Sequence, residues 1–306
     1  MDRDFLSIDD VTPRELHHLL ESAAKIKQSP ADYAIRLAGM AVALIFEKPS
    51  TRTRVSFEVG VASLGGHPLA LSSSELQLGR GETIEDTGQV LSRYCQAIVL
   101  RTFGQERLEA LAAGASVPVI NSLSDYEHPC QILADLLTVI ERKGDPAGRT
   151  LAYLGDGNNV AHSLLLGGAM LGMHLRVATP TGFEPIPQVV ERAEEIATAT
   201  GGSIAVGNNP EAAARGADVL YTDVWASMGQ EREHAERVLV FTPYRIDADK
   251  LALAAGDAIV LHCLPAHRGE EITDEVIDGP ASAVWDQAEN RLHTQKALLL
   301  WLLGRE

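Results

Sequence analysis

Basic residues are scarce in this chain, and their scarcity narrows the range of partners it can have. Lys and Arg total 26 against 42 Asp and Glu, which gives a formal charge of −16 over 306 residues. Proteins that bind nucleic acids or anionic membranes present basic surfaces, so this balance argues against both partners. An anionic substrate would then be held by a few local arginines in an otherwise acidic protein.

Aromatic residues, cysteines and long apolar runs are also in short supply. Only 5% of the residues are aromatic against 45% hydrophobic overall, so Leu, Val, Ile and Ala must fill most of an ample core. The three cysteines, Cys95, Cys130 and Cys263, lack paired or CxxC spacing, which favours a reduced intracellular protein. The first five residues show neither a basic n-region nor an apolar h-region, so no secretory leader is expected, and runs such as 40–46 are too short to cross a bilayer. We therefore expect a cytoplasmic protein.

Short apolar runs alternate with helical patterns along the chain. A chain of this length is about twice a common domain length, which makes two domains the natural expectation. Thr12, Pro13 and Glu15 form a capping-box pattern that begins a first helix. Strands are predicted at 40–46, 97–100 and 117–120, and helices at about 53–64 and 83–94. This alternation predicts a parallel sheet with helices on its faces.

A second series of strands and helices begins near Thr150. Gly144 and Pro146 interrupt a helix and mark the break between the two series. Strands are predicted at 151–155, 175–178, 204–206, 219–222 and 259–264, with a helix at about 159–171. The fold class is therefore α/β, with two domains, 1–145 and 146–287, that are each a parallel sheet flanked by helices. The apolar helix at about 288–306 should pack back on the first domain, and the active site is expected in the interdomain cleft.

Hydroxyl and guanidinium side chains gather where the first strand ends. The run Ser50-Thr51-Arg52-Thr53-Arg54 follows a strand and a turn and enters the next helix. A helix N-terminus offers free N–H groups, and Arg52 can bridge a phosphate with two hydrogen bonds. A capped helix with two solvated arginines is the alternative, but three interleaved hydroxyls favour anion binding. No GxxxxGK[ST] pattern occurs, and the glycine-containing run at 154–159 misses GxGxxG because Val160 replaces the third glycine, which disfavours nucleotides.

Polar side chains also follow the later strands of the first half. Arg101 follows the strand predicted at 97–100, and Pro129 opens a helix and so fixes the directions of His128 and Gln131. In isolation, His128 is more often a cap-region or surface histidine, and the plain alternative for Arg101 is a surface residue at a strand end.

In the second half, Asp223 follows one strand and His262-Cys263-Leu264-Pro265 follows another. A carboxylate before a glycine-containing loop suits recognition of a cationic amine. The plain alternatives are a helix cap for Asp223 and a buried small residue for Cys263. Zinc held by His262, Cys263 and His267 is a weaker alternative because the sequence offers no second ligand cluster, so no metal is expected.

The segment from Phe46 to Arg54 resembles the carbamoyl-phosphate motif of the aspartate and ornithine carbamoyltransferase family. Length and two-domain order extend the resemblance over essentially the whole chain. In that family HPxQ contacts the carbamoyl group, with His128 at its oxygen and Gln131 at its nitrogen, and Gln77 matches a loop lent to a neighbouring subunit. Cys130 is expected to contribute backbone more than thiol chemistry. The implied carbamoyl-phosphate site comprises Ser50, Thr51, Arg52, Thr53, Gln77, Arg101, His128, Pro129, Cys130, Gln131, Cys263, Leu264 and Arg291.

The second half resembles the ornithine-binding part of the same family. Ser227-Met228-Gly229 looks like the ornithine-binding loop, which aspartate-specific relatives lack, and 262–265 matches the HCLP motif of the ornithine enzymes. The resemblance implies that Cys263 lies beside the reacting amine, as proton acceptor or as ligand. The implied ornithine-binding residues are Asn159, Asp223, Ser227 and Met228. The implied catalytic residues are Arg101, His128, Gln131, Asp223 and Cys263.

The implied reaction transfers the carbamoyl group of carbamoyl phosphate to the δ-amine of L-ornithine, giving L-citrulline and phosphate. The resemblance assigns carbamoyl phosphate to domain 1–145 and ornithine to domain 146–287. It implies no cofactor, a role in arginine metabolism with biosynthesis expected, and a homotrimer or an assembly of trimers. Two alternatives stay open: a carbamoyltransferase for another acceptor (aspartate, putrescine or an acylated ornithine), and a non-catalytic sensor of carbamoyl phosphate or an amino acid.

Overall fold

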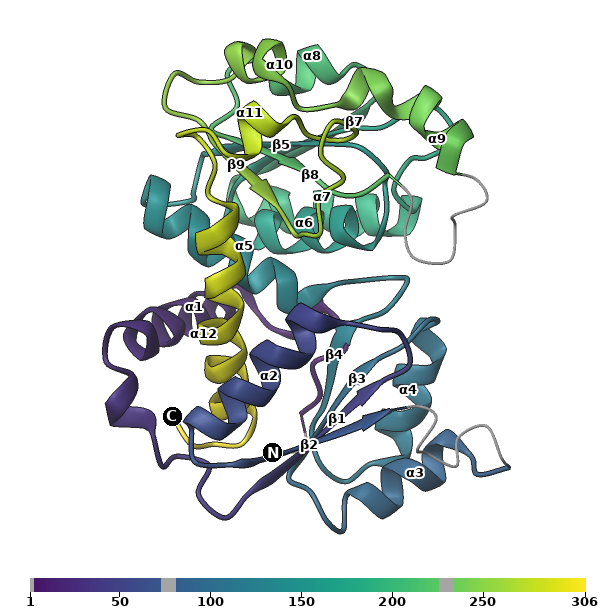
Figure 1. The fold of residues 1–306 in the computed structure, drawn as a ribbon, viewed down its shortest axis with the longest axis vertical. Coiled ribbons are helices and arrows are strands. Elements are labelled where there is room, and N and C mark those ends of the chain that lie inside the picture. Colours follow the sequence, from purple (N-terminus) through teal and green to yellow (C-terminus); the bar gives the residue numbers. More distant parts are fainter. Residues whose placement is uncertain (1–2, 73–80, 226–233) are drawn as a thin grey trace. The chain divides into compact units, whose positions relative to one another are not determined.

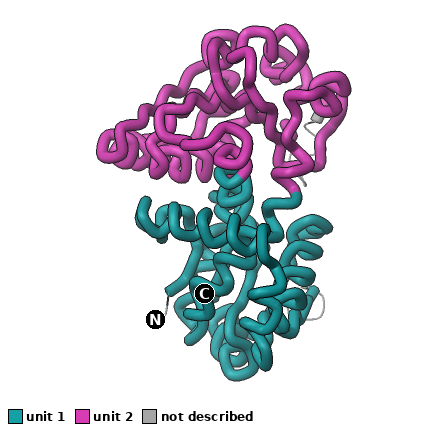
Figure 2. Tube along the Cα trace, turned by 90° about the vertical axis from the view of Figure 1, so that its left-hand side faces the viewer, with its two compact units in different colours: residues 1–137, 289–306 teal, residues 138–288 magenta. Residues whose placement is uncertain are grey.

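The computed structural model describes residues 3–72, 81–225 and 234–306. The chain forms two compact units, residues 1–137 with 289–306 and residues 138–288 (Figure 2). It passes from the first unit to the second within helix α5 (Pro129–Lys143) and returns within helix α12 (Val284–Leu302). Each unit is built around its own parallel sheet.

The first unit has a four-stranded sheet with the strand order β2-β1-β3-β4 (Figure 1). Its strands are β1 (Ala41–Phe46), β2 (His67–Ser72), β3 (Ala97–Arg101) and β4 (Val119–Leu123). Its helices are α1 (Pro13–Gln28), α2 (Thr51–Ser63), α3 (Ile84–Leu91) and α4 (Gln105–Gly114), with 3-10 helices at Ile8–Asp10 and Pro30–Tyr33. The chain winds to one side of β1 and then to the other, so the winding direction reverses between β1 and β3.

Local sequence explains how these elements begin and how the chain end joins them. Thr12 caps α1 and the Glu15 side chain bonds back to the Thr12 backbone, which is the capping box that the sequence predicts. The C-terminal part of α12 packs on α1 and α2. Lys27 Nζ donates to Asn290 Oδ1 at 2.7 Å, and Gly60 of α2 faces Lys296. Because Gly60 has no side chain, α12 can pack closely against this face of α2.

The second unit has a five-stranded sheet with the order β7-β6-β5-β8-β9 (Figure 1). Its strands are β5 (Thr150–Leu154), β6 (His174–Ala178), β7 (Ser203–Gly207), β8 (Val219–Thr222) and β9 (Ile259–His262). Its helices are α6 (Asn159–Met170), α7 (Pro187–Thr200), α8 (Pro210–Ala214), α9 (His234–Phe241), α10 (Ala248–Leu253) and α11 (Asp274–Ile277), with a 3-10 helix at Thr242–Tyr244. Here the winding direction reverses between β5 and β8.

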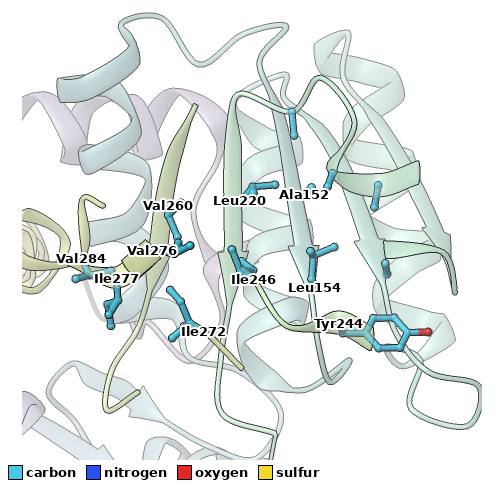
Figure 3. Close-up of a cluster of buried hydrophobic side chains, with 14 residues drawn as sticks. Ala152, Leu154, Leu220, Tyr244, Ile246, Val260, Ile272, Val276, Ile277 and Val284 are labelled. Carbon is cyan, nitrogen blue, oxygen red and sulfur yellow. The ribbon is translucent and has the colours of Figure 1, made fainter. Parts of the chain in front are cut away.

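An apolar cluster joins the second sheet to the segments that follow β8 and β9 (Figure 3). Ala152 and Leu154 lie two residues apart on β5 and therefore share one face of the sheet. Ile272 and Val276 pack into the same cluster from the region of α11. The hydroxyl of Tyr244 lies 2.8 Å from the carbonyl oxygen of Asn208, so its polar end is paired. Burying each large aliphatic side chain of this kind stabilises the fold by about 1.5–3 kcal/mol.

The predicted fold class is confirmed, with two parallel sheets flanked by helices. Element ends differ from the sequence patterns by a few residues. The strand expected at 117–120 is β4, the strand expected at 259–264 ends at His262, and the last helix begins at Val284. The patterns do not predict β2, because this half-exposed edge strand has no continuous apolar run. In the described ranges, no helix combines the length and hydrophobicity needed to cross a membrane.

Candidate active site

The first unit gathers polar side chains at the carboxyl ends of β1 and β3. Phe46 and Arg101 end these strands as register partners. The Glu47 N–H donates to the carbonyl oxygen of Arg101 at 2.9 Å, which holds the two strand ends together. In open α/β sheets, ligands bind where the winding direction reverses, because the loops leaving the two strands diverge there. The topology therefore places Arg101 and the turn after β1 at the expected binding point.

The N-terminus of α2 lies at this point and has no side-chain cap. Ser50 occupies the N-cap position, but its hydroxyl accepts a hydrogen bond from Arg101 Nη1 at 2.8 Å. The first-turn N–H groups are therefore not engaged by Ser50 and can serve as donors to an anion. Arg52 is exposed on the same turn. The alternative of an ordinary Ser cap does not fit this arrangement.

Arg291 of α12 reaches the same helix from the other end of the chain. Its Nη2 donates to Thr53 Oγ1 at 2.6 Å, and both side chains are buried. Two guanidinium groups, Arg101 and Arg291, thus contact hydroxyls of the first turn of α2. Together with the positive end of the helix dipole they form a concentrated cationic site in an acidic protein, as a phosphate group requires.

The same two arginines act on His128, which immediately precedes α5. Burial, with the charges of Arg291 and Arg101, lowers the pKa of His128 well below its ordinary value. The imidazole is therefore neutral near pH 7 and donates a single N–H. The Gln131 N–H donates to the His128 carbonyl oxygen at 3.0 Å, which starts the helix and fixes the two side chains one turn apart.

Pro129 and Cys130 complete this turn and are fully enclosed. Pro129 is the first residue of α5 and is buried. The Cys130 thiol donates to the carbonyl oxygen of Asn121 at 3.3 Å, and burial raises its pKa to about 12. A thiol that stays protonated and bonded to the backbone is chemically inert. This environment fits the expectation that Cys130 contributes backbone.

Glu47 is a residue of this site that the motifs do not single out. Its carboxylate accepts hydrogen bonds from Thr102 Oγ1 and from two nitrogens of Arg107. These bonds tie the turn after β1 to the segment after β3. A cavity of about 270 Å³ lies beside the turn, lined in part by Glu47 and Ser50.

The second unit repeats this arrangement where β5 and β8 end. The Thr222 hydroxyl donates to the carbonyl oxygen of Leu154 at 2.7 Å and so joins the two strand ends. In the turn after β5, a Cβ on Gly157 would lie 2.3 Å from Pro185 N, so glycine is required there. The next residue, Asn158, caps α6 by accepting the N–H of Val160.

Asp223 is the centre of the second cluster. Its Oδ1 accepts from Cys263 Sγ at 2.8 Å and its Oδ2 accepts from Asn158 Nδ2 at 3.0 Å. The carboxylate is almost completely buried, with 6% of its residue surface exposed. Asp223 and Cys263, both predicted to meet the amine, are therefore in direct contact. Asn158 was not predicted, although Asn159 beside it was, and the preference of Asn for the N-cap position is the signal that points to it.

His262 fixes the turn that carries Cys263. The N–H of Leu264 donates to His262 Nδ1 at 2.8 Å, so Nδ1 is an acceptor and Nε2 carries the ring hydrogen. His262 Nε2 lies 3.1 Å from Glu271 Oε1, and both side chains are fully buried. Leu264 has a φ of 59°, a conformation that few residues other than glycine adopt, and the Leu264–Pro265 peptide is cis.

The zinc alternative is not supported by this geometry. Donor atoms of Asp223, His262 and Cys263 lie within 4.8 Å of one another, as a metal site requires. However, Leu264 and Glu271 already engage both ring nitrogens of His262. In the described part of the chain, His267 forms a separate group with Glu270 and Glu271 rather than joining His262 and Cys263.

Arg237 of α9 pairs with Asp156 in the turn after β5. Its guanidinium also lies 4.8 Å from the ring centre of Phe183 and 5.1 Å from that of Phe241. Burial raises the pKa of Asp156 to about 6, against the opposing effect of Arg237. This ion pair, which the sequence patterns do not reveal, connects α9 to the turn that carries Asn158.

The predicted residues fall into two groups, one in each unit. The first unit brings together Ser50, Thr51, Arg52, Thr53, Arg101, His128, Pro129, Cys130, Gln131 and Arg291. The second unit brings together Asn159, Asp223, Cys263 and Leu264. Gln77, Ser227 and Met228 lie outside the described residues.

Two consecutive family models together match nearly the whole chain. The carbamoyl-P binding domain of the aspartate/ornithine carbamoyltransferases matches residues 3–141, and their Asp/Orn binding domain matches residues 147–302. The chain belongs to the aspartate/ornithine carbamoyltransferase family. The resemblance carried by a few short motifs is thereby confirmed over both units.

Individual relatives agree with the family models. An ornithine carbamoyltransferase from Acidothermus cellulolyticus is 62% identical over 305 residues, which cover 99% of this chain and 97% of the relative. The solved structure of an ornithine carbamoyltransferase from Pyrococcus furiosus has a TM-score of 0.96 and 53% identity, covering 99% of this chain and 97% of that one. An acetylornithine transcarbamylase complexed with acetylcitrulline has a TM-score of 0.88 and 31% identity over 98% of both chains.

Proposed function

We propose that this protein is an ornithine carbamoyltransferase, which forms L-citrulline and phosphate from carbamoyl phosphate and L-ornithine. The observation that carries the proposal is the pair of arginines at the uncapped start of α2. Arg101 bonds Ser50 and Arg291 bonds Thr53, while both charges act on a neutral His128. Relatives named for this activity match nearly the whole chain, at up to 62% identity in the case cited above.

In the proposed first half-reaction, carbamoyl phosphate binds to the first unit. The N–H groups and hydroxyls of Ser50, Thr51 and Thr53, with the guanidinium of Arg52, receive the phosphate oxygens. Arg101 and His128 donate to the carbamoyl oxygen, where negative charge grows as the amine attacks. Because His128 is neutral, it stabilises this charge through its N–H and not by proton transfer.

In the proposed second half, ornithine binds to the second unit. Asp223 and Cys263 accept hydrogen bonds from the δ-amine, and Asn159, Ser227 and Met228 contact the rest of the amino acid. The neutral amine attacks the carbonyl carbon, a C–N bond forms, and the C–O bond to phosphate breaks. The proton that the attacking nitrogen loses is taken up by the departing phosphate, which leaves as hydrogen phosphate. The mixed anhydride is already activated, so most of the acceleration comes from orientation and charge stabilisation.

We further propose that the protein acts as a homotrimer in the cytoplasm. In the family resemblance, Gln77 serves the site of a neighbouring subunit. Val55 and Val59, one turn apart on α2, are 50% and 48% exposed and offer an apolar face for such a neighbour. None of the three cysteines, all of which lie in described ranges, forms a disulfide, as a reducing compartment favours.

The decisive experiment is citrulline formation by the purified wild type beside Arg52→Ala. Loss of two charge-assisted hydrogen bonds, at about 1.5–3 kcal/mol each, should lower kcat/KM for carbamoyl phosphate by about 100-fold or more. Arg192→Ala is the matched control, because Arg192 is an exposed arginine on α7 that pairs with Glu195. Undiminished activity in Arg52→Ala would remove the phosphate-site assignment.

The acceptor is tested in the same assay. Aspartate, putrescine and N-acetylornithine replace ornithine at equal concentration, and ornithine should give the highest kcat/KM. A preference for another acceptor would assign the protein to a sibling activity. Tight binding of both substrates without any carbamoylated product would identify a sensor.

A further inference from the structure

Gln131 is held by a buried carboxylate that the reaction itself does not use. Gln131 and Asp135 lie four residues apart on α5 and therefore share one helix face. Gln131 Nε2 donates to Asp135 Oδ1 at 2.8 Å, and the two residues are 1% and 0% exposed. A hydrogen bond this deeply buried constrains the amide far more than a bond at the surface does.

The chemistry of the carboxylate decides which way the amide faces. An amide group has an oxygen and a nitrogen of similar size, so its orientation depends on its partners. Asp135 Oδ1 accepts the hydrogen bond from Gln131 Nε2, so the Gln131 NH₂ faces Asp135. The reverse orientation would place two acceptors 2.8 Å apart. Asp135 therefore leaves Gln131 Oε1 as the end that faces elsewhere.

Gln131 Oε1 is buried and has no hydrogen-bond partner among the described residues. A buried acceptor without a hydrogen-bond partner lowers the stability of the fold by about 1–3 kcal/mol. Such atoms are therefore rare unless a bound ligand donates a hydrogen bond to them. One turn earlier, the neutral His128 presents a single N–H. One donor and one acceptor on the same helix start match the oxygen and the NH₂ of a carbamoyl group.

We propose that Asp135 is a positioning residue that sets the specificity for a carbamoyl group, by holding Gln131 Oε1 towards the NH₂ of the substrate. This inference rests on the proposed function for the identity of the ligand. Acetyl phosphate has the same shape but carries CH₃ in place of NH₂, so it offers no donor to Oε1. Fixing the amide therefore favours carbamoyl phosphate over acetyl phosphate and leaves the phosphate contacts unchanged.

Asp135→Asn tests the proposal with almost no change in shape. The substituted amide can present either its oxygen or its nitrogen, so Gln131 is no longer held in one orientation. The preference for carbamoyl phosphate over acetyl phosphate should fall about 5- to 10-fold, as expected for one hydrogen bond. Affinity for inorganic phosphate should stay within about twofold, because its contacts lie at α2. Asp249→Asn, at an exposed position on α10, is the control.

The swapped pair Gln131→Glu with Asp135→Asn supplies a second test. It exchanges donor and acceptor, conserves charge and again leaves an acceptor oxygen towards the substrate NH₂. Recovery of at least half of the lost preference, on a logarithmic scale, is expected. An equal loss of affinity for all three phosphates in Asp135→Asn, or an unchanged preference in a folded variant, would overturn the proposal. A double variant no more selective than Asp135→Asn would do the same.

The readout separates this inference from the proposed function. Binding of carbamoyl phosphate, acetyl phosphate and inorganic phosphate is measured by ligand-dependent thermal stabilisation, with no acceptor present. A wild type that discriminates between the phosphates but forms no citrulline would refute the proposed activity. The selectivity of Asp135→Asn for the three phosphates would then still decide the inference. If the wild type forms citrulline but Asp135→Asn binds the three phosphates with the same selectivity as the wild type, the inference alone would be refuted.

Discussion

The three cysteines of this chain have three different chemical environments. Cys95 and Cys130 are buried, and burial raises the pKa of each thiol. Cys263 is half-buried and directs its sulfur to Asp223 at 2.8 Å. Of the three, Cys263 is therefore the one whose thiol lies beside a carboxylate, as its proposed role next to the reacting amine requires. The residue type is the same in all three cases, and the surroundings of each thiol decide its chemistry.

Asp156 provides a prediction about pH. Burial raises its pKa to about 6 despite Arg237, roughly two pH units above the ordinary Asp value. A carboxyl with a raised folded-state pKa contributes stability below its unfolded pKa and loses it as pH rises through the folded value. The free energy of unfolding of the wild type should therefore fall by about 2 kcal/mol relative to Asp156→Asn between pH 4 and pH 7.

Denaturant unfolding of both proteins at several pH values measures this difference. Asp156→Asn keeps the shape of the protonated carboxyl and removes its titration, so it isolates the contribution of one group. Asp249→Asn, an exposed substitution on α10, should track the wild type at every pH. A constant offset between wild type and Asp156→Asn across the range would contradict the assigned pKa.

Single residues show where sequence reasoning succeeds and where it stops. Ser50, Arg101 and His128 follow strands or begin helices, so their positions at strand ends could be predicted from local patterns. Asp135 and Glu271 could not, because a buried acidic residue inside a helix or loop has no local signal. Their importance depends on which polar group lies opposite, and only the tertiary structure supplies that partner.

At the scale of elements, strand order explains why both clusters form. Residues separated by about 40–70 positions meet because β1 lies beside β3 and β5 beside β8, each at a reversal of winding. The alternation of strands and helices predicted two parallel sheets. It did not predict the order within them, because apolar runs of similar composition do not specify their neighbours. The edge strand β2 was not predicted either, because it is only half-buried and so lacks the continuous apolar run by which the other strands were recognised.

The turn between β5 and α6 carries a prediction of its own. A Cβ at position 157 would lie 2.3 Å from Pro185 N, a backbone atom that cannot move without the whole turn. Gly157→Ala should lower the free energy of unfolding by about 1–3 kcal/mol through overpacking. It should also raise KM for ornithine, because Asn158 and its contact with Asp223 shift with the turn.

The comparison variant for this prediction is Gly207→Ala. Gly207 ends the edge strand β7, and a Cβ there would meet no atom within 4 Å. Denaturation midpoints and KM values for both substrates distinguish the two variants. KM for carbamoyl phosphate should change less than KM for ornithine in Gly157→Ala, because the phosphate contacts proposed at the start of α2, with Arg101 and Arg291, belong to the other unit. Equal behaviour of the two glycine variants would show that the close approach is relieved without consequence.

At the scale of the whole molecule, the acidic composition and the cationic site are compatible. A net charge of −16 keeps the surface unattractive to nucleic acid, while Arg52, Arg101 and Arg291 gather around one helix end. Composition alone predicted this contrast, since an anionic substrate must be bound by a few residues. It could not show that the third arginine comes from the last helix.

Subunit assembly gives the last prediction. If Gln77 of one subunit serves the site of its neighbour, each site takes Arg52 from one subunit and Gln77 from the next. Arg52→Ala and Gln77→Ala then remove residues that different subunits contribute to one site. Each variant alone should be nearly inactive, because every site then lacks one of the two residues. In mixed trimers, a site combining Arg52 from one subunit with Gln77 from the next is intact.

Random assembly of equal amounts of the two variants should restore about a quarter of wild-type citrulline formation. Half of the sites receive a subunit that retains Arg52, and half of those have a neighbour that retains Gln77. Co-refolding the two variants and assaying the mixture against each variant refolded alone measures this recovery. A mixture no more active than its components would show that Gln77 acts within its own subunit or that the sites are not shared.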